Sequence, residues 1–272
     1  MRRKVCAFVR RCQDCHRLKP FPYSNVGLHS REVVTCPLER VFIDFVVPTV
    51  RSREGNIAVL VVFDDFSKFV CIYPVRRISS EVVKNCLVEK LFPSFGVPQS
   101  IVSDNAAVFK SSRFYNLCFS WGIRHITTSR YYPQASQVER FNRNLKVALV
   151  ICHNFQHTHW DEQLSSLALA FNSAWHESTA GTPVSLFLGR ELNHPLGPKR
   201  KLFQLELDKD AKNMGEFWET TLGNLRKARA KVAGRNDAGR RRAEFRVGEL
   251  VLVRVHPLSS KSRQRYAKLH YK

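Results

Sequence analysis

The stretch VFIDFVV at residues 41–47 places one carboxylate inside an otherwise apolar segment. Its β-branched and aromatic residues predict a buried strand, and Asp44 interrupts that strand. A buried carboxylate is costly unless a partner compensates its charge. A divalent cation is the usual compensation, and oxygen ligands favour Mg²⁺ or Mn²⁺. Asp44 is therefore the first candidate metal ligand.

Two more carboxylates stand in contexts that suit the same chemistry. Asp104 follows the short apolar run 100–103, and Glu139 opens a helical stretch. Neither is specific by itself, because Ser-Asp-Asn is a common turn and an exposed Glu139–Arg143 helical pair contributes only ~0.3–0.5 kcal/mol. Together, three carboxylates can hold two ions about 3.5–4 Å apart, which activate an attacking oxygen and stabilise the leaving one. We predict that Asp44, Asp104 and Glu139 form such a site for two Mg²⁺ or Mn²⁺ ions.

The dipeptide Asp64-Asp65 is the rival to this site. It stands between two predicted strands at a plausible turn, where solvated acids are normal. We therefore expect both of these carboxylates to face solvent rather than a metal ion.

The helix that begins near Glu139 has an apolar face and a polar one. Apolar residues recur at the spacing of a buried helical stripe, namely Phe141, Leu145, Ala148 and Cys152. Candidate contacts for DNA phosphates are the polar residues of the same helix, namely Asn142, Arg143 and Lys146.

The charge balance favours a polyanionic partner. Lys and Arg number 44 against 23 Asp and Glu, which gives a net charge of +21, and such an excess is typical of nucleic-acid binding. A solvated basic surface or a ribosome-associated protein is the alternative. Part of the excess lies in residues 226–242, where Arg240, Arg241 and Arg242 are further candidates for phosphate contacts. No apolar run approaches ~18 residues, so we expect no membrane partner. We expect the eight cysteines to be reduced thiols of an intracellular protein.

The order of predicted elements indicates an α/β fold. Strands are predicted over 41–47, 57–63, 68–73, 99–103 and 123–127. Helices are predicted from Ser79 or Ser80 to Pro93, from Ser111 or Ser112 to near Gly122, from about Gln137, after 160–161, at 182–183 and over 209–231. The first three strands suggest an antiparallel meander, and the whole order predicts a mixed sheet with helices on its faces.

The words around the three acids resemble the integrases of retroviruses and LTR retrotransposons, with gypsy- and BEL-like elements the most similar. The words are PLERVFIDF at 37–45, IVSDN at 101–105 with Phe109 beyond, GIRH at 122–125, YPQ at 132–134, ERFNRNLK at 139–146, AFNSAWH at 170–176, TP at 182–183 and LGRE at 188–191. The resemblance implies an RNase H-like catalytic core over residues 37–195. It also implies that Asp44, Asp104 and Glu139 are the metal-binding catalytic triad.

The resemblance extends weakly to both flanks. It implies a remnant of a zinc-binding module and a linker over 1–36, a basic helical linker over 196–243, and the start of an incomplete SH3-like DNA-binding barrel over 244–272. Cys12 and Cys15 have the spacing of one side of a tetrahedral zinc site, but no His precedes Cys12. We therefore expect no complete zinc site of the family type.

The resemblance implies a polynucleotidyl transferase with endonuclease activity, which processes retroelement 3′ ends and joins them to target DNA as a homo-multimer in the nucleus. Two departures bear on activity. Ala106 stands where the family has glycine, and 34 residues separate Asp104 from Glu139, one fewer than the family pattern. The alternatives are a domesticated or decayed integrase-like protein that binds DNA without catalysis, and an RNase H-type nuclease that cleaves RNA in a hybrid.

Overall fold

The computed structural model describes residues 33–48, 50–128, 137–152, 157–192, 214–237 and 248–249. The chain divides into two compact units, one of Glu32–Arg229 and one of Met1–Arg31 with Ala230–Lys272. The sheet and the candidate site both lie in the first unit. In the part of the chain that the structure describes, no helix is long and apolar enough to cross a membrane.

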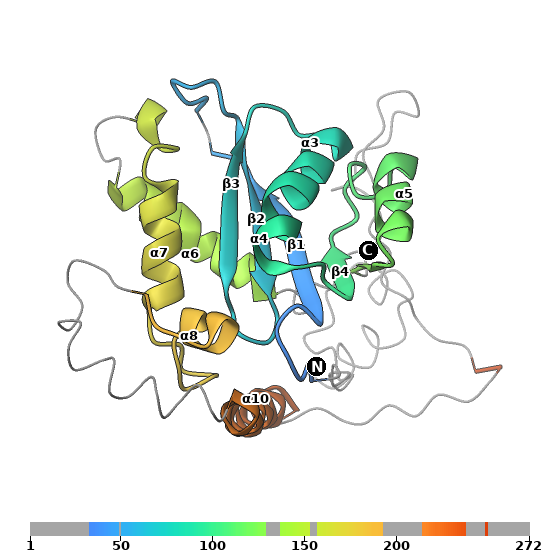
Figure 1. Ribbon diagram of the computed structural model, residues 1–272, viewed down its shortest axis with the longest axis vertical. Coiled ribbons are helices and arrows are strands. Elements are labelled where there is room, and N and C mark those ends of the chain that lie inside the picture. The colour runs from blue at the N-terminus through green and yellow to red at the C-terminus, as the bar shows by residue number, and fades with distance from the viewer. Residues whose placement is uncertain are drawn as a thin grey trace, which may run out of the picture. The chain divides into compact units, whose positions relative to one another are not determined.

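A five-stranded mixed sheet forms the centre of this unit (Figure 1). Its strands are β1 (Arg40–Val46), β2 (Ala58–Asp64), β3 (Val70–Val75), β4 (Ser100–Ser103) and β5 (Arg124–Thr127), in the order β3-β2-β1-β4-β5. The first three pair antiparallel, and β4 and β5 are parallel to β1. The predicted meander and mixed sheet are therefore confirmed.

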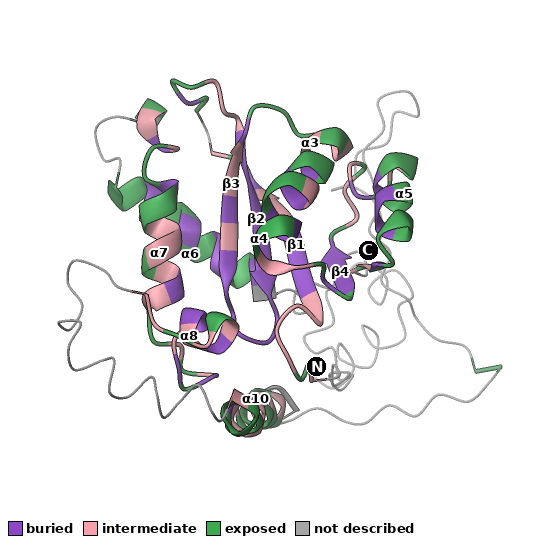
Figure 2. Ribbon diagram, in the orientation of Figure 1, coloured by how far each residue is buried: buried purple, intermediate pink, exposed green. Residues whose placement is uncertain are grey.

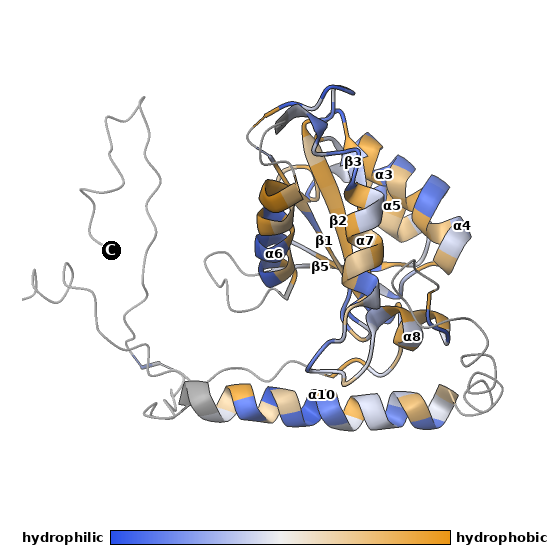
Figure 3. Cartoon of the chain, turned by 90° about the vertical axis from the view of Figure 1, so that its left-hand side faces the viewer, coloured by the Kyte–Doolittle hydropathy of each residue, from blue (hydrophilic) through white to orange (hydrophobic). Residues whose placement is uncertain are grey.

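Helices cover the sheet on both faces. The helical elements of the described residues are α3 (Ser80–Asn85), a π-helical turn at Cys86–Leu91, α4 (Phe92–Phe95), α5 (Ser112–Ser120), α6 (Gln137–Cys152), a 3₁₀ turn at His157–His159, α7 (Leu164–Ser173), α8 (Pro183–Leu188) and α10 (Met214–Asp237). Figure 3 shows α6 on one side of the sheet and α3, α4 and α5 on the other.

Burial follows the alternation of the strands. Ile43 of β1 packs in the core beneath α3 and α5. Phe42 and Val46 of the same strand point to the opposite face and pack in the core beneath α6 and α7. Strand β2, which lies between β3 and β1, is buried at every position (Figure 2), as expected of a strand covered on both faces. Asp44, two residues from Phe42, consequently points toward the α6 layer.

Two local predictions were wrong. The helix predicted to stop at Pro93 continues through α4 and ends at Gly96, which has φ +98°. Pro93 lies in the first turn of α4, directly after the π-helical turn, and proline is tolerated in a first helical turn because its missing N–H is not needed there.

The apolar stripe of α6 is formed by Val138, Phe141, Leu145 and Leu149, whereas Cys152 is exposed.

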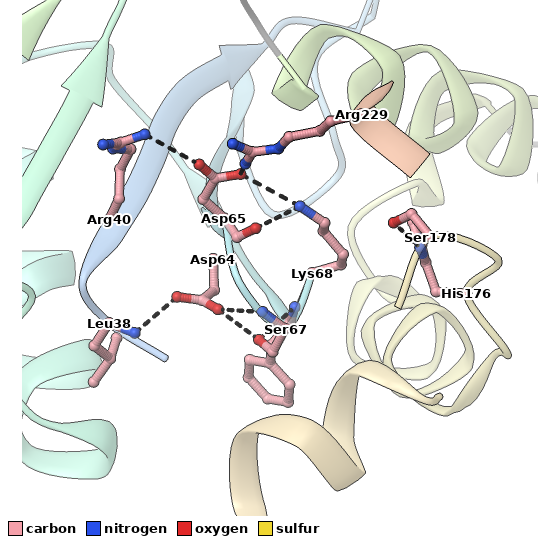
Figure 4. Close-up of polar contacts among 10 residues, drawn as sticks. Leu38, Arg40, Asp64, Asp65, Ser67, Lys68, His176, Ser178 and Arg229 are labelled. Atoms are coloured by element: carbon pink, nitrogen blue, oxygen red, sulfur yellow. Dashed lines mark hydrogen bonds and ion pairs between the residues drawn. The ribbon is translucent and has the colours of Figure 1, made fainter. Parts of the chain in front are cut away.

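The expectation that Asp64 and Asp65 are solvated was also wrong, because both are buried. Asp64 accepts hydrogen bonds from the amides of Leu38 and Ser67 and from the Ser67 hydroxyl, at 2.6–2.8 Å (Figure 4). Asp65 pairs with Lys68 at 3.3 Å and with Arg40 at 3.5 Å. These donors satisfy the buried charge, so the hairpin is a structural ion cluster.

The first two-thirds of α10 pack against this unit. Leu225 lies in a small apolar cluster with Val34 and Phe66, and the Trp218 ring meets Phe66 edge-on at 6.1 Å. Trp218 also donates a hydrogen bond from Nε1 to the Leu186 carbonyl at 3.1 Å. Arg229 lies 3.8 Å from Asp65, which joins this end of the packed segment to the hairpin ion cluster.

Candidate active site

Parallel pairing of β1 with β4 places the first two acids on neighbouring strands. Ile43 is the register partner of Ser103, so Asp44 and Asp104 each follow one member of that pair. Asp104 lies just past the end of β4, is exposed, and accepts a hydrogen bond from the Ala106 amide at 3.0 Å. The sheet therefore brings together carboxylates that are 60 residues apart in the sequence.

Glu139 comes from the first turn of α6. Its neighbours Val138 and Phe141 are buried against the sheet, whereas Glu139 itself is exposed. Asp44 faces this helix, and its Oδ2 accepts a hydrogen bond from Asn142 Nδ2 at 2.7 Å. The α6 turn that carries Glu139 is thus fixed beside Asp44.

The pKa of Asp44 shows that the three acids share one electrostatic environment. The pKa of Asp44 is raised to about 6, mainly by burial and also by the negative charges of Asp104 and Glu139, against hydrogen bonds from the Phe45 amide and Asn142 that lower it. A like charge disfavours the ionised form of its neighbour. The site therefore concentrates negative charge, and none of the ion pairs among the described residues involves these three acids.

A hard divalent cation fits this donor set, although the side chains are not gathered around a common point. In the described ranges, no three His, Cys, Asp or Glu side chains are arranged closely enough to hold a metal ion. The donors are nonetheless carboxylate oxygens only, which suit Mg²⁺ or Mn²⁺. A bound cation would offset the repulsion that raises the Asp44 pKa, so Asp44, Asp104 and Glu139 stay the predicted ligands.

Residues 34–133 match the integrase core domain family. This chain carries a retroviral-type integrase core domain. It is 30% identical over 196 residues to the Pro-Pol polyprotein of simian foamy virus type 3, with 72% of this chain and 17% of that protein covered. It is 25% identical over 263 residues to the retrovirus-related Pol polyprotein from transposon 412 of Drosophila melanogaster, with 93% of this chain and 21% of that protein covered. The chain thus spans about a fifth of the length of these relatives.

A solved structure of the simian T-cell lymphotropic virus intasome in complex with the PP2A regulatory subunit B56 gamma has the same fold. Its TM-score is 0.55 at 23% identity, and the match covers 73% of this chain and 69% of that one. The RNase H-like α/β fold predicted for this integrase core is therefore confirmed.

Asn142 of the integrase core has a role that the sequence did not indicate. It was predicted to contact DNA, but its side chain is buried and bonds to Asp44. Its Oδ1 is buried and has no hydrogen-bond partner in the described part of the chain. The sequence held one signal for a place of Asn142 in the site: it follows Glu139 by three residues, and residues at i and i+3 share a helix face. Arg143 and Lys146 are exposed on α6 and stay predicted DNA contacts.

Several predicted residues lie outside the described residues. They are Cys12 and Cys15, residues 132–134 with the YPQ word, and Arg240, Arg241 and Arg242. The zinc-module remnant over 1–36 and the barrel over 244–272 consequently stay predictions.

Proposed function

We propose that this chain is the integrase of an LTR retroelement, acting as a polynucleotidyl transferase on DNA. The observation that carries the proposal is the pairing of Ile43 with Ser103, after which Asp44 and Asp104 follow on neighbouring strands, with the helix of Glu139 bonded to Asp44 through Asn142. Carboxylates that repel one another gain from binding a cation between them. The membership of residues 34–133 in the integrase core family supports the same reaction class.

In the proposed reaction, water attacks a phosphodiester near each retroelement end and releases a 3′-hydroxyl, which then attacks a phosphodiester of target DNA in line. Bound divalent ions would supply activation of the attacking oxygen and stabilisation of the leaving oxygen. Asp44 contributes a carboxylate held in one orientation by Asn142 and by the Phe45 amide at 2.8 Å. Asp104 and Glu139 face DNA from exposed positions.

The predicted partners belong to the same proposal. Retroelement ends and chromosomal target DNA would bind through phosphate contacts, for which Arg143 and Lys146 are exposed on the helix of Glu139. We further propose that the protein acts as a homo-multimer on DNA and in the nucleus. A net charge of +21 favours a polyanionic partner of this kind.

A strand-transfer assay on a pre-cut oligonucleotide tests the proposal. Asp44→Asn and Glu139→Gln should each lower the rate by at least about 10²-fold, because loss of preorganised charge stabilisation has effects of this size. Glu89→Gln removes an exposed acid of the π-helical turn and should leave the rate unchanged. Equal rates for wild type and both site variants would refute the proposal.

A DNA-binding protein without catalysis is the second candidate. It is favoured by the absence, in the described ranges, of three side chains arranged closely enough to hold a metal ion. Binding of the oligonucleotide without strand transfer in either Mg²⁺ or Mn²⁺ would decide for this candidate. Cleavage of RNA in a hybrid would instead indicate an RNase H-type nuclease.

A further inference from the structure

Four aromatic rings form a continuous row beneath the candidate active site. Phe45 stacks on Phe109 at 5.6 Å and 20°, Phe109 meets Phe114 edge-on at 5.6 Å and 69°, and Phe114 meets His125 edge-on at 4.9 Å and 84°. Phe109 and Phe114 are almost fully buried. We call these four residues the aromatic row. Such ring pairs contribute about 0.5–1.5 kcal/mol each beyond area burial, so the row is a rigid element.

One end of the aromatic row directly follows a candidate metal ligand in the chain, and the other end bonds to the residue that precedes one. Phe45 follows Asp44 in β1, and the Phe45 amide donates a hydrogen bond to Asp44 Oδ1 at 2.8 Å. At the other end, His125 Nε2 lies 2.9 Å from Ser103 Oγ, and Ser103 directly precedes Asp104. The row therefore connects the backbone at Asp44 with the backbone at Asp104 on the face of the sheet opposite α6.

Counting hydrogens assigns the direction of the bond between His125 and Ser103. The Ser103 hydroxyl has a single hydrogen, and it donates to the Asp104 carbonyl at 3.0 Å. Ser103 Oγ must then accept from His125, so Nε2 carries the hydrogen. Burial lowers the pKa of His125, which favours the neutral ring, and the bond to Ser103 then selects the tautomer with the hydrogen on Nε2.

Further bonds hold the same segment against β5. The Thr128 amide donates to the Ser103 carbonyl at 2.9 Å, and Asn105 Nδ2 donates to the Thr128 carbonyl. The residues on both sides of Asp104 are thus fixed to the end of β5, while Asp104 itself is exposed.

We propose that His125 is a positioning residue whose hydrogen bond to Ser103, braced by the aromatic row, sets where Asp104 lies relative to Asp44 for binding a divalent cation. The inference rests on the proposed function, because it requires these acids to bind the ion. If His125 only packed in the core, an aromatic ring without a hydrogen-bond donor would serve equally well. The proposed role requires the donor. The donor and the ring can be separated by substitution.

The experiment measures the dissociation constant for Mn²⁺ on the full 272-residue chain without DNA, from the electron paramagnetic resonance signal of free Mn²⁺. His125→Phe keeps a ring and removes the donor, His125→Gln keeps a donor near the Nε2 position, and Ser103→Ala removes the acceptor. Residues that orient metal ligands typically change metal affinity by about 10–100-fold. We expect His125→Phe and Ser103→Ala each to weaken Mn²⁺ binding about 10-fold, and His125→Gln to restore affinity to within about 3-fold of wild type.

Because the two groups act through one bond, the double variant Ser103→Ala/His125→Phe should bind Mn²⁺ no more weakly than either single variant. The chain offers a matched control in His176 and Ser178, a half-buried histidine and a serine 3.0 Å apart. In the described residues, neither is a hydrogen-bond partner of the three acids. Ser178→Ala should therefore leave Mn²⁺ affinity unchanged.

Asp104→Asn separates failure of the inference from failure of the proposed function. If Asp104→Asn weakens Mn²⁺ binding while His125→Phe and Ser103→Ala do not, the inference is overturned and the proposed function stands. If Asp104→Asn has no effect, the acids do not bind the ion and both are overturned. If His125→Gln binds as weakly as His125→Phe, the ring rather than the donor matters and the positioning role is refuted. Melting temperatures identify a variant that does not fold, in which case the remaining variants decide.

Discussion

Neutralising Asp65 should destabilise the integrase core although this residue lies outside the candidate active site. The Asp65 side chain is fully buried and pairs with Lys68, itself only 3% exposed, at 3.3 Å. Removing one partner of a buried ion pair costs about 3–5 kcal/mol. Asp64 also attracts the Lys68 charge, and burial lowers the Lys68 pKa, so deprotonation of Lys68 limits the penalty. We therefore expect Asp65→Asn to cost ~3 kcal/mol, which corresponds to a fall in melting temperature of about 6–12 °C for a domain of this size.

Urea unfolding of Asp65→Asn measures this cost, and the chain contains an exposed pair as its control. Lys84 and Glu81 have the same i,i+3 spacing at 3.6 Å, but their side chains are 51% and 52% exposed, so Glu81→Gln should cost no more than ~1 kcal/mol. The double variant Asp65→Asn/Lys68→Met should recover part of the loss, because it removes Lys68, the most buried of the three cations that pair with Asp65. A cost for Asp65→Asn as small as that for Glu81→Gln would refute the reasoning.

Three further predictions concern the acids and the basic tail. The folded-state pKa of Asp44, about 6 against an ordinary value of 3.8, means that the folded protein binds more protons than the unfolded chain between these values. Its stability therefore falls as pH rises through this window, and urea unfolding should show that Asp44→Asn stabilises the metal-free protein by ~3 kcal/mol at pH 7 but not at pH 4. Asn142→Ala removes a bond that lowers the Asp44 pKa, so the acidic limb of the strand-transfer pH profile should move to higher pH; an unmoved limb would show that this bond is not made in solution. Deleting residues 238–272 retains α10 and should reduce the slope of log affinity for duplex DNA against log salt by ~0.9 for each phosphate that the segment neutralises, and an unchanged slope would exclude this segment from phosphate binding.

Strand patterning predicted most of the sheet because burial on both faces produces near-continuous apolar runs, as in residues 57–63. Local signals also predicted helix caps at Ser79 or Ser80 and at Ser111 or Ser112. The caps are Ser79 and Ser111, and each accepts a hydrogen bond from an amide three residues on. The burial of Asp64 and Asp65 could not be predicted in this way. Their donors include Leu38 and Arg229, which are far from the hairpin in sequence, and only the fold brings them together.

In the candidate site, too, the sequence predicted single residues but not the contacts between distant parts of the chain. Asp44 was predictable because it interrupts an apolar strand, and the resemblance added Asp104 and Glu139. The contact between Asn142 and Asp44, which are 98 residues apart, was not predictable from spacing alone. It requires α6 to lie across β1 at one particular rotation, which depends on the burial of Val138 and Phe141.

Asp65 and the three candidate site acids differ in the positive charge around them. This difference distinguishes a carboxylate that stabilises the fold from carboxylates that serve the proposed site. Asp65 forms ion pairs with Arg40, Lys68 and Arg229. By contrast, none of the ion pairs found in the described ranges involves Asp44, Asp104 or Glu139. In a chain with a net charge of +21, cations are abundant, so a fold that needed only stability would be expected to pair these acids as it pairs Asp65. Because Asp104 and Glu139 instead raise the Asp44 pKa by repulsion, the arrangement of these acids in the described residues agrees with the proposed site for a divalent cation.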